Sequence, residues 1–201
     1  MKLTVVVQAG GQSRRMGSNK ALLPFLGKPL IQRVVDRIRP VADEILITSN
    51  QPEDFQFLNL PVFGDLLPGY GALGGLLTAL TISSSPVTAV VACDMPFVSA
   101  DLLKHQVKIL ESGNWDAVVP KSVSGYEPLH AVYRTQTCRQ AVQQAIENGE
   151  KKMIAWFPAA KIYYVEKEDL AQFDPHERIF LNVNTLSEFQ AAEQIAQAET
   201  G

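Results

Sequence analysis

Residues 5–20 contain the stretch that decides the fold, Val-Val-Val-Gln-Ala-Gly-Gly-Gln-Ser-Arg-Arg-Met-Gly-Ser-Asn-Lys. Leu3, Val5 and Val7 alternate within an apolar, β-branched run, which is typical of a strand in the core of a sheet. The glycines that follow allow backbone turns that residues with a Cβ resist. The pattern predicts a buried strand that runs directly into a glycine-rich loop.

The loop combines glycine with positive charge. Backbone N–H groups in such a turn can converge on an anion, and Arg14, Arg15 and Lys20 add fixed positive charge. The spacing matches neither a Walker A loop nor the Gly-x-Gly-x-x-Gly of dinucleotide-binding proteins. The loop is therefore predicted to hold a triphosphate, with a glycine-rich turn carrying solvated basic residues as the alternative.

Strands and helices alternate through the first 110 residues. Strands are expected at residues 44–48, 60–63 and 87–93, and helices from Pro29, from the glycine-rich segment 69–75 and from Ala100. This order implies βαβ crossovers, so we predict an α/β protein with a three-layer Rossmann-like fold and a mostly parallel central sheet. Ligands of such sheets bind outside the carboxyl ends of the strands.

The second half of the chain is less regular. Strands are expected at residues 115–120, 127–134, 161–165 and 180–183, and helices at 135–148 and 151–157. Thr185 and Glu188 have the spacing of a capping box ahead of a terminal helix. Because no linker or repeat interrupts the pattern, we expect one domain over residues 1–201, with halves of about 1–110 and 111–201.

Composition excludes several classes of protein. The chain has 201 residues, 46% of them hydrophobic, and a net charge of −3, which disfavours a general nucleic-acid binder. Two distant cysteines indicate neither a disulfide framework nor a zinc site. No stretch approaches a membrane span or a signal peptide, so we expect no membrane association and a cytoplasmic location. Positive charge is concentrated near the loop, since residues 1–35 contain six basic and no acidic residues.

Asp94 is the first candidate outside the loop, because it ends an apolar strand. A nucleoside triphosphate is normally handled with Mg²⁺, which prefers carboxylate and phosphate oxygens. Asp94 is therefore predicted to bind Mg²⁺, the alternative being an Asp that only bonds the turn at Met95 and Pro96. Asp65, which follows a short strand, is a second candidate, although an Asp before Leu-Leu-Pro-Gly is also an ordinary turn residue.

The pattern Ala-Gly-Gly-x-Ser-x-Arg-Met-Gly-x-x-Lys over residues 9–20 resembles the signature of nucleotidyltransferases with a Rossmann-like fold. Within that family the chain is most similar to the molybdenum cofactor guanylyltransferases, also in Cys-Asp-x-Pro-Phe at 93–97 and Asn-Val-Asn-Thr at 182–185. The resemblance implies transfer of GMP from GTP to the terminal phosphate of molybdopterin, release of pyrophosphate and use of Mg²⁺. Proteins of cofactor synthesis and acceptor molybdoenzymes are the implied protein partners.

The resemblance also implies roles for individual residues. Arg15, Lys20 and Asp94 would carry catalysis, with Asp94 as the metal ligand. The nucleotide would be bound by Gln8, Ala9, Gly10, Gly11, Lys20, Asp65 and Asp94. The acceptor would be bound by Asn182 and Asn184 in the second half of the chain. His130 would either face the acceptor or have a structural role.

Two residues depart from the family pattern on the nucleotide side. Gln8 replaces the usual Leu before Ala-Gly-Gly, and Thr48 stands where some members have Asn. The sequence therefore leaves open a nucleotidyltransferase that uses CTP with the same pterin, or an NTP with a sugar or alcohol phosphate. A nucleotide-binding module without turnover is a more remote alternative, because Asp94 is present.

Overall fold

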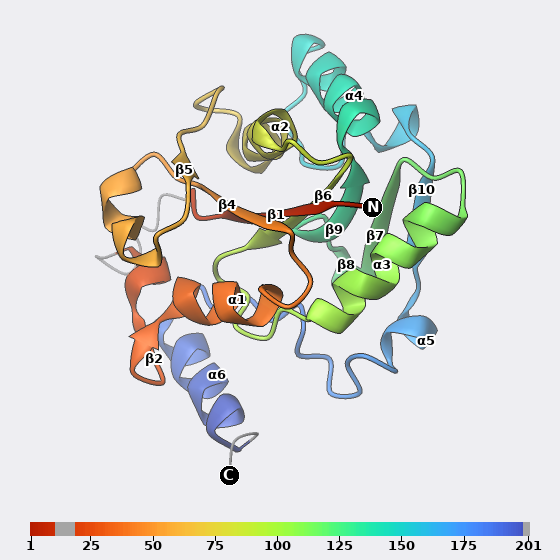
Figure 1. Cartoon of the computed structure of the whole chain (residues 1–201). Helices are drawn as coiled ribbons and strands as arrows, with labels where there is room; N and C mark the ends of the chain where they lie inside the picture. The colour runs from red at the N-terminus through yellow and green to blue at the C-terminus, as the bar shows by residue number, and fades with distance from the viewer. Residues whose placement is uncertain (11–18, 199–201) are drawn as a thin grey trace.

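A computed structural model of the chain describes residues 1–10 and 19–198 (Figure 1). The central sheet has eight strands in the order β10-β7-β9-β6-β1-β4-β5, with β8 paired to β7. The strands are β1 (Leu3–Gln8), β4 (Glu44–Thr48), β5 (Val62–Phe63), β6 (Val87–Ala92), β7 (Ala117–Ser122), β8 (Gly125–Tyr126), β9 (His130–Arg134) and β10 (Ile162–Val165). The helices are α1 (Leu30–Ile38), α2 (Gly71–Ile82), α3 (Ala100–Ser112), α4 (Thr135–Glu147), α5 (Lys167–Leu170) and α6 (Leu186–Ala198).

The sheet is mostly parallel, which confirms the predicted fold class. β1 pairs in parallel with both β4 and β6, β4 with β5, and β7 with β10. β9 runs against both of its neighbours, β6 and β7. Two reversals in succession leave β7 parallel to β6. The carboxyl ends of β1, β4, β6 and β7 therefore lie on the same side of the sheet, which is called here the carboxyl edge.

Side chains that alternate along β1 divide the core into two layers. Val5 and Val7 pack in one apolar cluster with residues of α1 and α3, while Val6 belongs to a second cluster with residues of α2 and α4. Figure 1 shows α1 and α3 on one face of the sheet and α2 and α4 on the other. The period of two in a strand produces this division, and it confirms the three-layer arrangement.

The β2–β3 hairpin and the helix α6 meet outside the sheet. Phe25, in a two-stranded hairpin formed by β2 (Pro24–Phe25) and β3 (Lys28–Pro29), packs edge-on against Phe189 of α6 with ring centroids 5.4 Å apart. Phe97, which follows β6, belongs to the same apolar cluster. This cluster places the segment before α6 against the end of β6.

Two expected elements of the second half are wrong. Residues 151–157 form turns rather than a helix, because Trp156 and Phe157 bury their rings against the core and Pro158 follows in the short helix η4 (Phe157–Ala159). Residues 180–183 form no strand, since the N–H of Val183 donates to the carbonyl oxygen of Asp94 (3.0 Å) in a loop contact.

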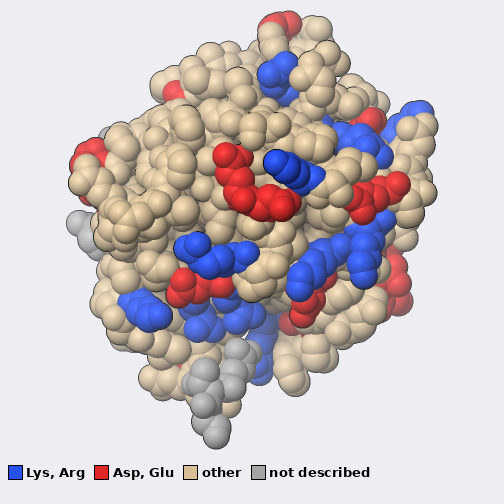
Figure 2. Space-filling view, in the orientation of Figure 1, with Lys and Arg blue, Asp and Glu red and all other residues tan. Residues whose placement is uncertain are grey.

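None of the helices within residues 1–10 and 19–198 is long and apolar enough to cross a membrane. Acidic and basic side chains are interspersed over the face drawn in Figure 2, where they form no broad basic surface.

Candidate active site

Three side chains from distant parts of the chain meet at the carboxyl edge. Lys20 Nζ donates to Asp94 Oδ2 and to Asn184 Oδ1, the latter at 2.8 Å. Lys20 and Asp94 are each only 16% exposed in their side chains, so the ion pair is largely shielded from water. Lys20, Asp94 and Asn184, called here the Lys–Asp–Asn cluster, form the centre of the candidate site.

The segment before α6 fixes Asn184. Glu188 Oε2 accepts from the backbone N–H groups of Asn184 (2.8 Å) and Thr185 (2.9 Å), and Glu188 N–H donates to Thr185 Oγ1 (3.2 Å). These bonds confirm the predicted capping box, and the two backbone donors lower the pKa of Glu188 below its usual range. The Val183 contact to the Asp94 carbonyl ties the same segment to the end of β6.

A short helix positions Lys20. Asn19 precedes η2 (Lys20–Leu22) and accepts from the N–H of Ala21 at 3.2 Å, while Asn19 Nδ2 donates to Asp54 Oδ2 at 3.0 Å. Ala21 is buried in the core. Lys20 is thereby placed at the start of a fixed turn, from which its side chain reaches the end of β6.

The oxygens of Asp94 and Asn184 converge on one positive charge. In this arrangement the Lys20 ammonium stands in for a cation held between a carboxylate and an amide oxygen. Both oxygen types are ligands that Mg²⁺ accepts, and Mg²⁺ commonly takes one or two protein ligands and completes its shell with phosphate and water. No cluster of three His, Cys, Asp or Glu is found within residues 1–10 and 19–198. The donor set therefore fits Mg²⁺ only together with a phosphate ligand.

Cys93 lies directly before Asp94 but offers no nucleophile. Burial, followed by the neighbouring Asp94 charge, raises the pKa of its thiol to about 12. The thiol therefore stays protonated at neutral pH, and only thiolates attack efficiently. Cys93 is best explained as a small core residue, as expected from its place in an apolar strand.

Asp65 and Gly10, both predicted to bind the nucleotide, lie close together. Asp65 N–H donates to Asn50 Oδ1 (2.9 Å) and Asn50 Nδ2 donates to Asp65 Oδ2 (3.1 Å). A Cβ added to Gly10 would lie 3.6 Å from Asp65 Oδ2, and Ala9 N–H donates to the carbonyl oxygen of Thr48 at 2.9 Å. The ends of β1, β4 and β5 thus bring the predicted nucleotide residues together. Asn50 was not predicted as a site residue, although the sequence places it in a polar segment directly after the strand at residues 44–48.

Gln8 turns toward α2, and its side chain is nearly buried. Its Nε2 finds no hydrogen-bond partner among the residues that the structure describes. A Cβ at Gly75 would come within 2.9 Å of Gln8 Oε1, so Gly75 is needed to admit this side chain. Gly75 was not predicted as a site residue, although a glycine inside a helical segment without a turn to explain it is a signal of close approach.

The remaining candidates are placed as follows. His130 is buried, accepts from the Ser99 N–H at Nε2 (3.1 Å), and has its pKa lowered to about 4 by burial. The imidazole is therefore neutral at pH 7, and its Nδ1 has no hydrogen-bond partner among the described residues. Asn182 Nδ2 donates to the carbonyl oxygen of Phe180 (3.3 Å). Asn182 thus precedes Asn184 of the Lys–Asp–Asn cluster in the chain but bonds outside the cluster. Gly11 and Arg15 lie outside the described residues.

Comparison with known proteins supports a single assignment over nearly the whole chain. A family model described as "MobA-like NTP transferase domain" matches residues 5–162. A "Probable molybdenum cofactor guanylyltransferase" from Carboxydothermus hydrogenoformans is 35% identical over 94% of this chain and 93% of its own length. A "Molybdenum cofactor guanylyltransferase" from Desulfosudis oleivorans is 31% identical over 98% and 96%. The solved structure of molybdopterin-guanine dinucleotide biosynthesis protein A from Archaeoglobus fulgidus has a TM-score of 0.83 and 29% identity, covering 97% of this chain and 99% of that one.

Proposed function

Because the chain belongs to the family of MobA-like NTP transferase domains, we propose that it transfers GMP from GTP to the terminal phosphate of molybdopterin and releases pyrophosphate. The observation that carries this proposal is the Lys–Asp–Asn cluster at the carboxyl edge. The names of the relatives supply the nucleotide and the acceptor.

The chemistry needs charge compensation more than proton transfer. An oxygen of the acceptor phosphate forms a bond to the α-phosphorus of GTP, while the bond from that phosphorus to the bridging oxygen breaks and pyrophosphate leaves with the electron pair. The attacking oxygen is already an anion, so no strong general base is required. The protein has to hold two repelling polyanions in line and stabilise the departing charge.

Asp94 and Asn184 would hold the metal. Both oxygens already face one cation, the Lys20 ammonium, which supports their use as a pair of metal ligands. When bound, Mg²⁺ supplies Lewis-acid polarisation of phosphate oxygens and a template for the triphosphate. Asp94 would orient this assembly from the rigid end of β6, and Asn184 from the capped segment before α6.

Lys20 would exchange its partners when GTP binds. An ammonium has three donors and no acceptor, so it can leave Asp94 and bind β and γ phosphate oxygens without any change of protonation. There it would stabilise the leaving pyrophosphate. Arg15 is expected to act beside it, a role that rests on the sequence.

The base and ribose would lie on the side of Gln8, Ala9, Gly10 and Asp65. Gly10 leaves room for close approach of the nucleotide, and Asp65 is held in place by Asn50. The Gln8 amide offers both a donor and an acceptor, which could pair with guanine or with cytosine. CTP is therefore the second nucleotide to test.

One experiment tests the proposal directly. The protein is incubated with each of the four NTPs and Mg²⁺, with and without molybdopterin, and the products are identified by mass spectrometry. We expect molybdopterin guanine dinucleotide and pyrophosphate only when GTP and molybdopterin are both present. A cytosine dinucleotide would correct the base assignment. Tight GTP binding with no product from any acceptor would instead indicate a nucleotide-binding module.

The state of the cysteines bears on the compartment in which the reaction takes place. Both cysteines are buried and unbridged, which suits a reducing compartment, and we place the reaction in the cytoplasm. Proteins that make molybdopterin and enzymes that receive the finished cofactor are the candidate partners, because the first supply the acceptor and the second take up the product. Cell fractionation and affinity capture from the source organism would check these two proposals.

A further inference from the structure

The turn that follows Asp94 is buried and is held by side chains from α1. Asp94 itself is partly exposed, whereas the next four residues are all buried, so their carbonyl oxygens need hydrogen-bond partners inside the protein. Arg33 Nε donates to the carbonyl oxygen of Pro96 (2.9 Å), and Arg37 Nε donates to that of Val98 (2.8 Å). The two arginines are one helical turn apart and therefore share one face of α1. That face holds the backbone directly after Asp94.

Arg33 also contacts aromatic rings from two other parts of the chain. Its guanidinium carbon lies 5.0 Å from the centroid of the Phe25 ring and 5.7 Å from that of the Phe97 ring. A cation within about 6 Å of a ring centroid is attracted to the ring. Phe25 in turn packs against Phe189, and all three rings belong to one apolar cluster with Val183. One guanidinium therefore connects the β2–β3 hairpin, the turn after β6 and, through Phe25, the helix α6.

The segments joined by Arg33 are those that carry the Lys–Asp–Asn cluster. Lys20 lies in η2, just before the β2–β3 hairpin, and Asp94 begins the buried turn. Asn184 precedes α6, and its neighbour Val183 donates its N–H to the carbonyl oxygen of Asp94 (3.0 Å). The relative positions of the three cluster members therefore depend on contacts that Arg33 helps to hold.

We propose that Arg33 is a positioning residue for the transfer reaction, because it aligns the Lys–Asp–Asn cluster through the Pro96 carbonyl and the rings of Phe25 and Phe97. This inference rests on the proposed GMP transfer, to which it adds a residue that acts on the geometry of the cluster from outside it. A displacement of about 1 Å near a reacting centre can cost about 10²-fold in rate. Loss of the alignment should therefore reduce turnover and metal binding more than the affinity for the nucleotide alone.

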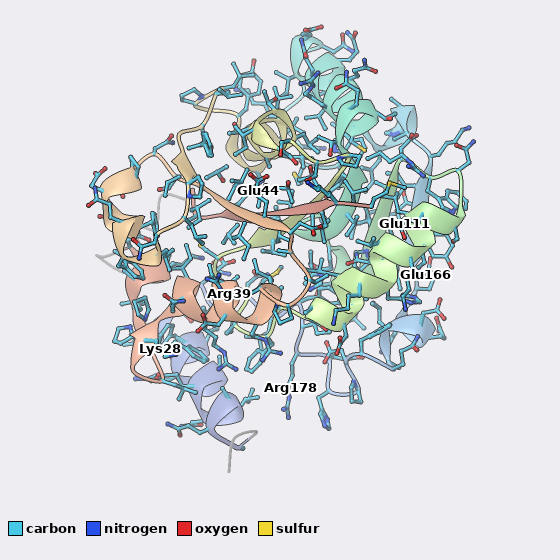
Figure 3. The ribbon with its side chains drawn as sticks, in the orientation of Figure 1. Lys28, Arg39, Glu44, Glu111, Glu166 and Arg178 are labelled. Carbon is cyan, nitrogen blue, oxygen red and sulfur yellow. The ribbon has the colours of Figure 1, made fainter. Side chains whose placement is uncertain are left out.

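The test removes the charge and the donor groups of Arg33 while it keeps most of the side-chain volume. Arg33→Met is flexible enough to fill the space beside the two rings but cannot donate to the Pro96 carbonyl. Arg33→Lys keeps the charge, but its compact ammonium cannot donate as a fork and stack on a ring as a planar guanidinium does. The matched control is Arg39→Met, at an exposed arginine that follows α1 (Figure 3).

Three measurements are made on each protein. Pyrophosphate release with GTP, Mg²⁺ and molybdopterin gives kcat and KM. Calorimetry gives the affinity for GTP with Mn²⁺, a probe for Mg²⁺, and with EDTA in its place. The ratio of these two affinities is called here the metal enhancement. Urea unfolding gives the stability, which a purely structural role of Arg33 would also lower.

We expect Arg33→Met to lower kcat at least about tenfold, with KM for GTP nearly unchanged. Its metal enhancement should fall at least about fivefold, while the affinity for GTP in EDTA stays at the wild-type value. Arg33→Lys should lie between Arg33→Met and wild type in both quantities, and Arg39→Met should match wild type.

A wild-type metal enhancement in Arg33→Met, whatever its kcat or stability, would overturn the positioning role even if GMP transfer proceeds. If Arg33→Met does not fold, a wild-type metal enhancement in Arg33→Lys would overturn it. A lowered metal enhancement in Arg33→Met, with no GMP transfer by wild type, would keep the positioning role and reject the proposed function. A wild-type protein whose GTP affinity is the same with Mn²⁺ and with EDTA would reject the metal site and this proposal with it.

Discussion

The two edges of the sheet use polar residues in opposite ways. At the amino-end edge, Thr4 Oγ1 lies 2.8 Å from Glu44 Oε2 and 2.8 Å from Ser85 Oγ, and Figure 3 shows Glu44 at the start of β4. At the carboxyl edge, Lys20 is shared between two oxygens, and Gln8 Nε2 has no partner in the described chain. Thr4, Glu44 and Ser85 at the first edge satisfy one another, whereas Gln8 at the second edge keeps hydrogen-bonding capacity for a ligand.

The largest effect should follow from removing the carboxylate at the carboxyl edge. Asp94→Asn keeps the shape of the side chain but loses the charge that would hold the metal, and we expect pyrophosphate release to fall about 10²–10³-fold. Glu44→Gln makes the same change at the amino-end edge and should retain the wild-type rate. Equal losses in both variants would remove the distinction between the edges.

A variant of His130 tests whether every buried polar residue at the carboxyl edge takes part in ligand binding. Its pKa of about 4, against a usual value of 6.5, means that the unfolded chain binds a proton in this interval while the folded chain does not. Stability should therefore fall as pH drops from 6.5 to about 4, by up to about 3 kcal/mol, and change no further below that interval.

Urea unfolding of wild type and His130→Gln across this pH range measures the contribution. Gln can accept from the Ser99 N–H without titrating, so the variant should show a flatter dependence. Parallel curves for the two proteins would mean that His130 is not held neutral by the fold.

Lys20→Ala separates a triphosphate contact from a general contribution to nucleotide affinity. A charge-assisted hydrogen bond is worth about 1.5–3 kcal/mol, so GTP affinity should fall about 10–100-fold. GMP lacks the β and γ phosphates and should bind nearly as well as to wild type. Calorimetry with both nucleotides checks this, and equal losses for GTP and GMP would contradict the assigned role.

The smallest effect is expected at the amino-end edge. Thr4→Val keeps the shape of the side chain and removes the hydroxyl between Glu44 and Ser85, at a cost of about 1 kcal/mol in the free energy of unfolding. Turnover should not change. Denaturant unfolding measures the stability and a pyrophosphate assay measures the turnover. A loss of turnover larger than the loss of stability can explain would mean that the amino-end edge takes part in catalysis.

The strands and Asp94 could be predicted because their signals are local. β1 and β6 are continuous apolar runs that end in glycine or in Asp94, and the parallel topology then puts both ends at one edge. The reversal of β9 was not predicted, because the apolar pattern of a strand does not indicate whether it runs parallel or antiparallel to its neighbours. The helix predicted at residues 151–157 was wrong, because a short apolar segment can bury its aromatic rings without forming a helix.

The site could be predicted only in part. Lys20 and Asp94 stand in recognisable motifs. They are 74 positions apart in the sequence, so their contact depends on the tertiary structure. Asn184 was assigned to the acceptor, and its bond to Lys20, from 164 positions away, depends on how α6 packs on the rest of the chain. The resemblance supplied the residue types, and the tertiary packing supplied their partners.

The contact between Phe25 and Phe189 has a consequence for the order in which the protein is made. A chain emerging during translation has the strands, the glycine-rich loop and Asp94 long before it has α6. Until α6 docks on the β2–β3 hairpin, Asn184 has no fixed place, and Lys20 and Asp94 lack their third member. A nascent chain can thus fold its sheet and still be unable to assemble the complete cluster, so docking of α6 completes the site.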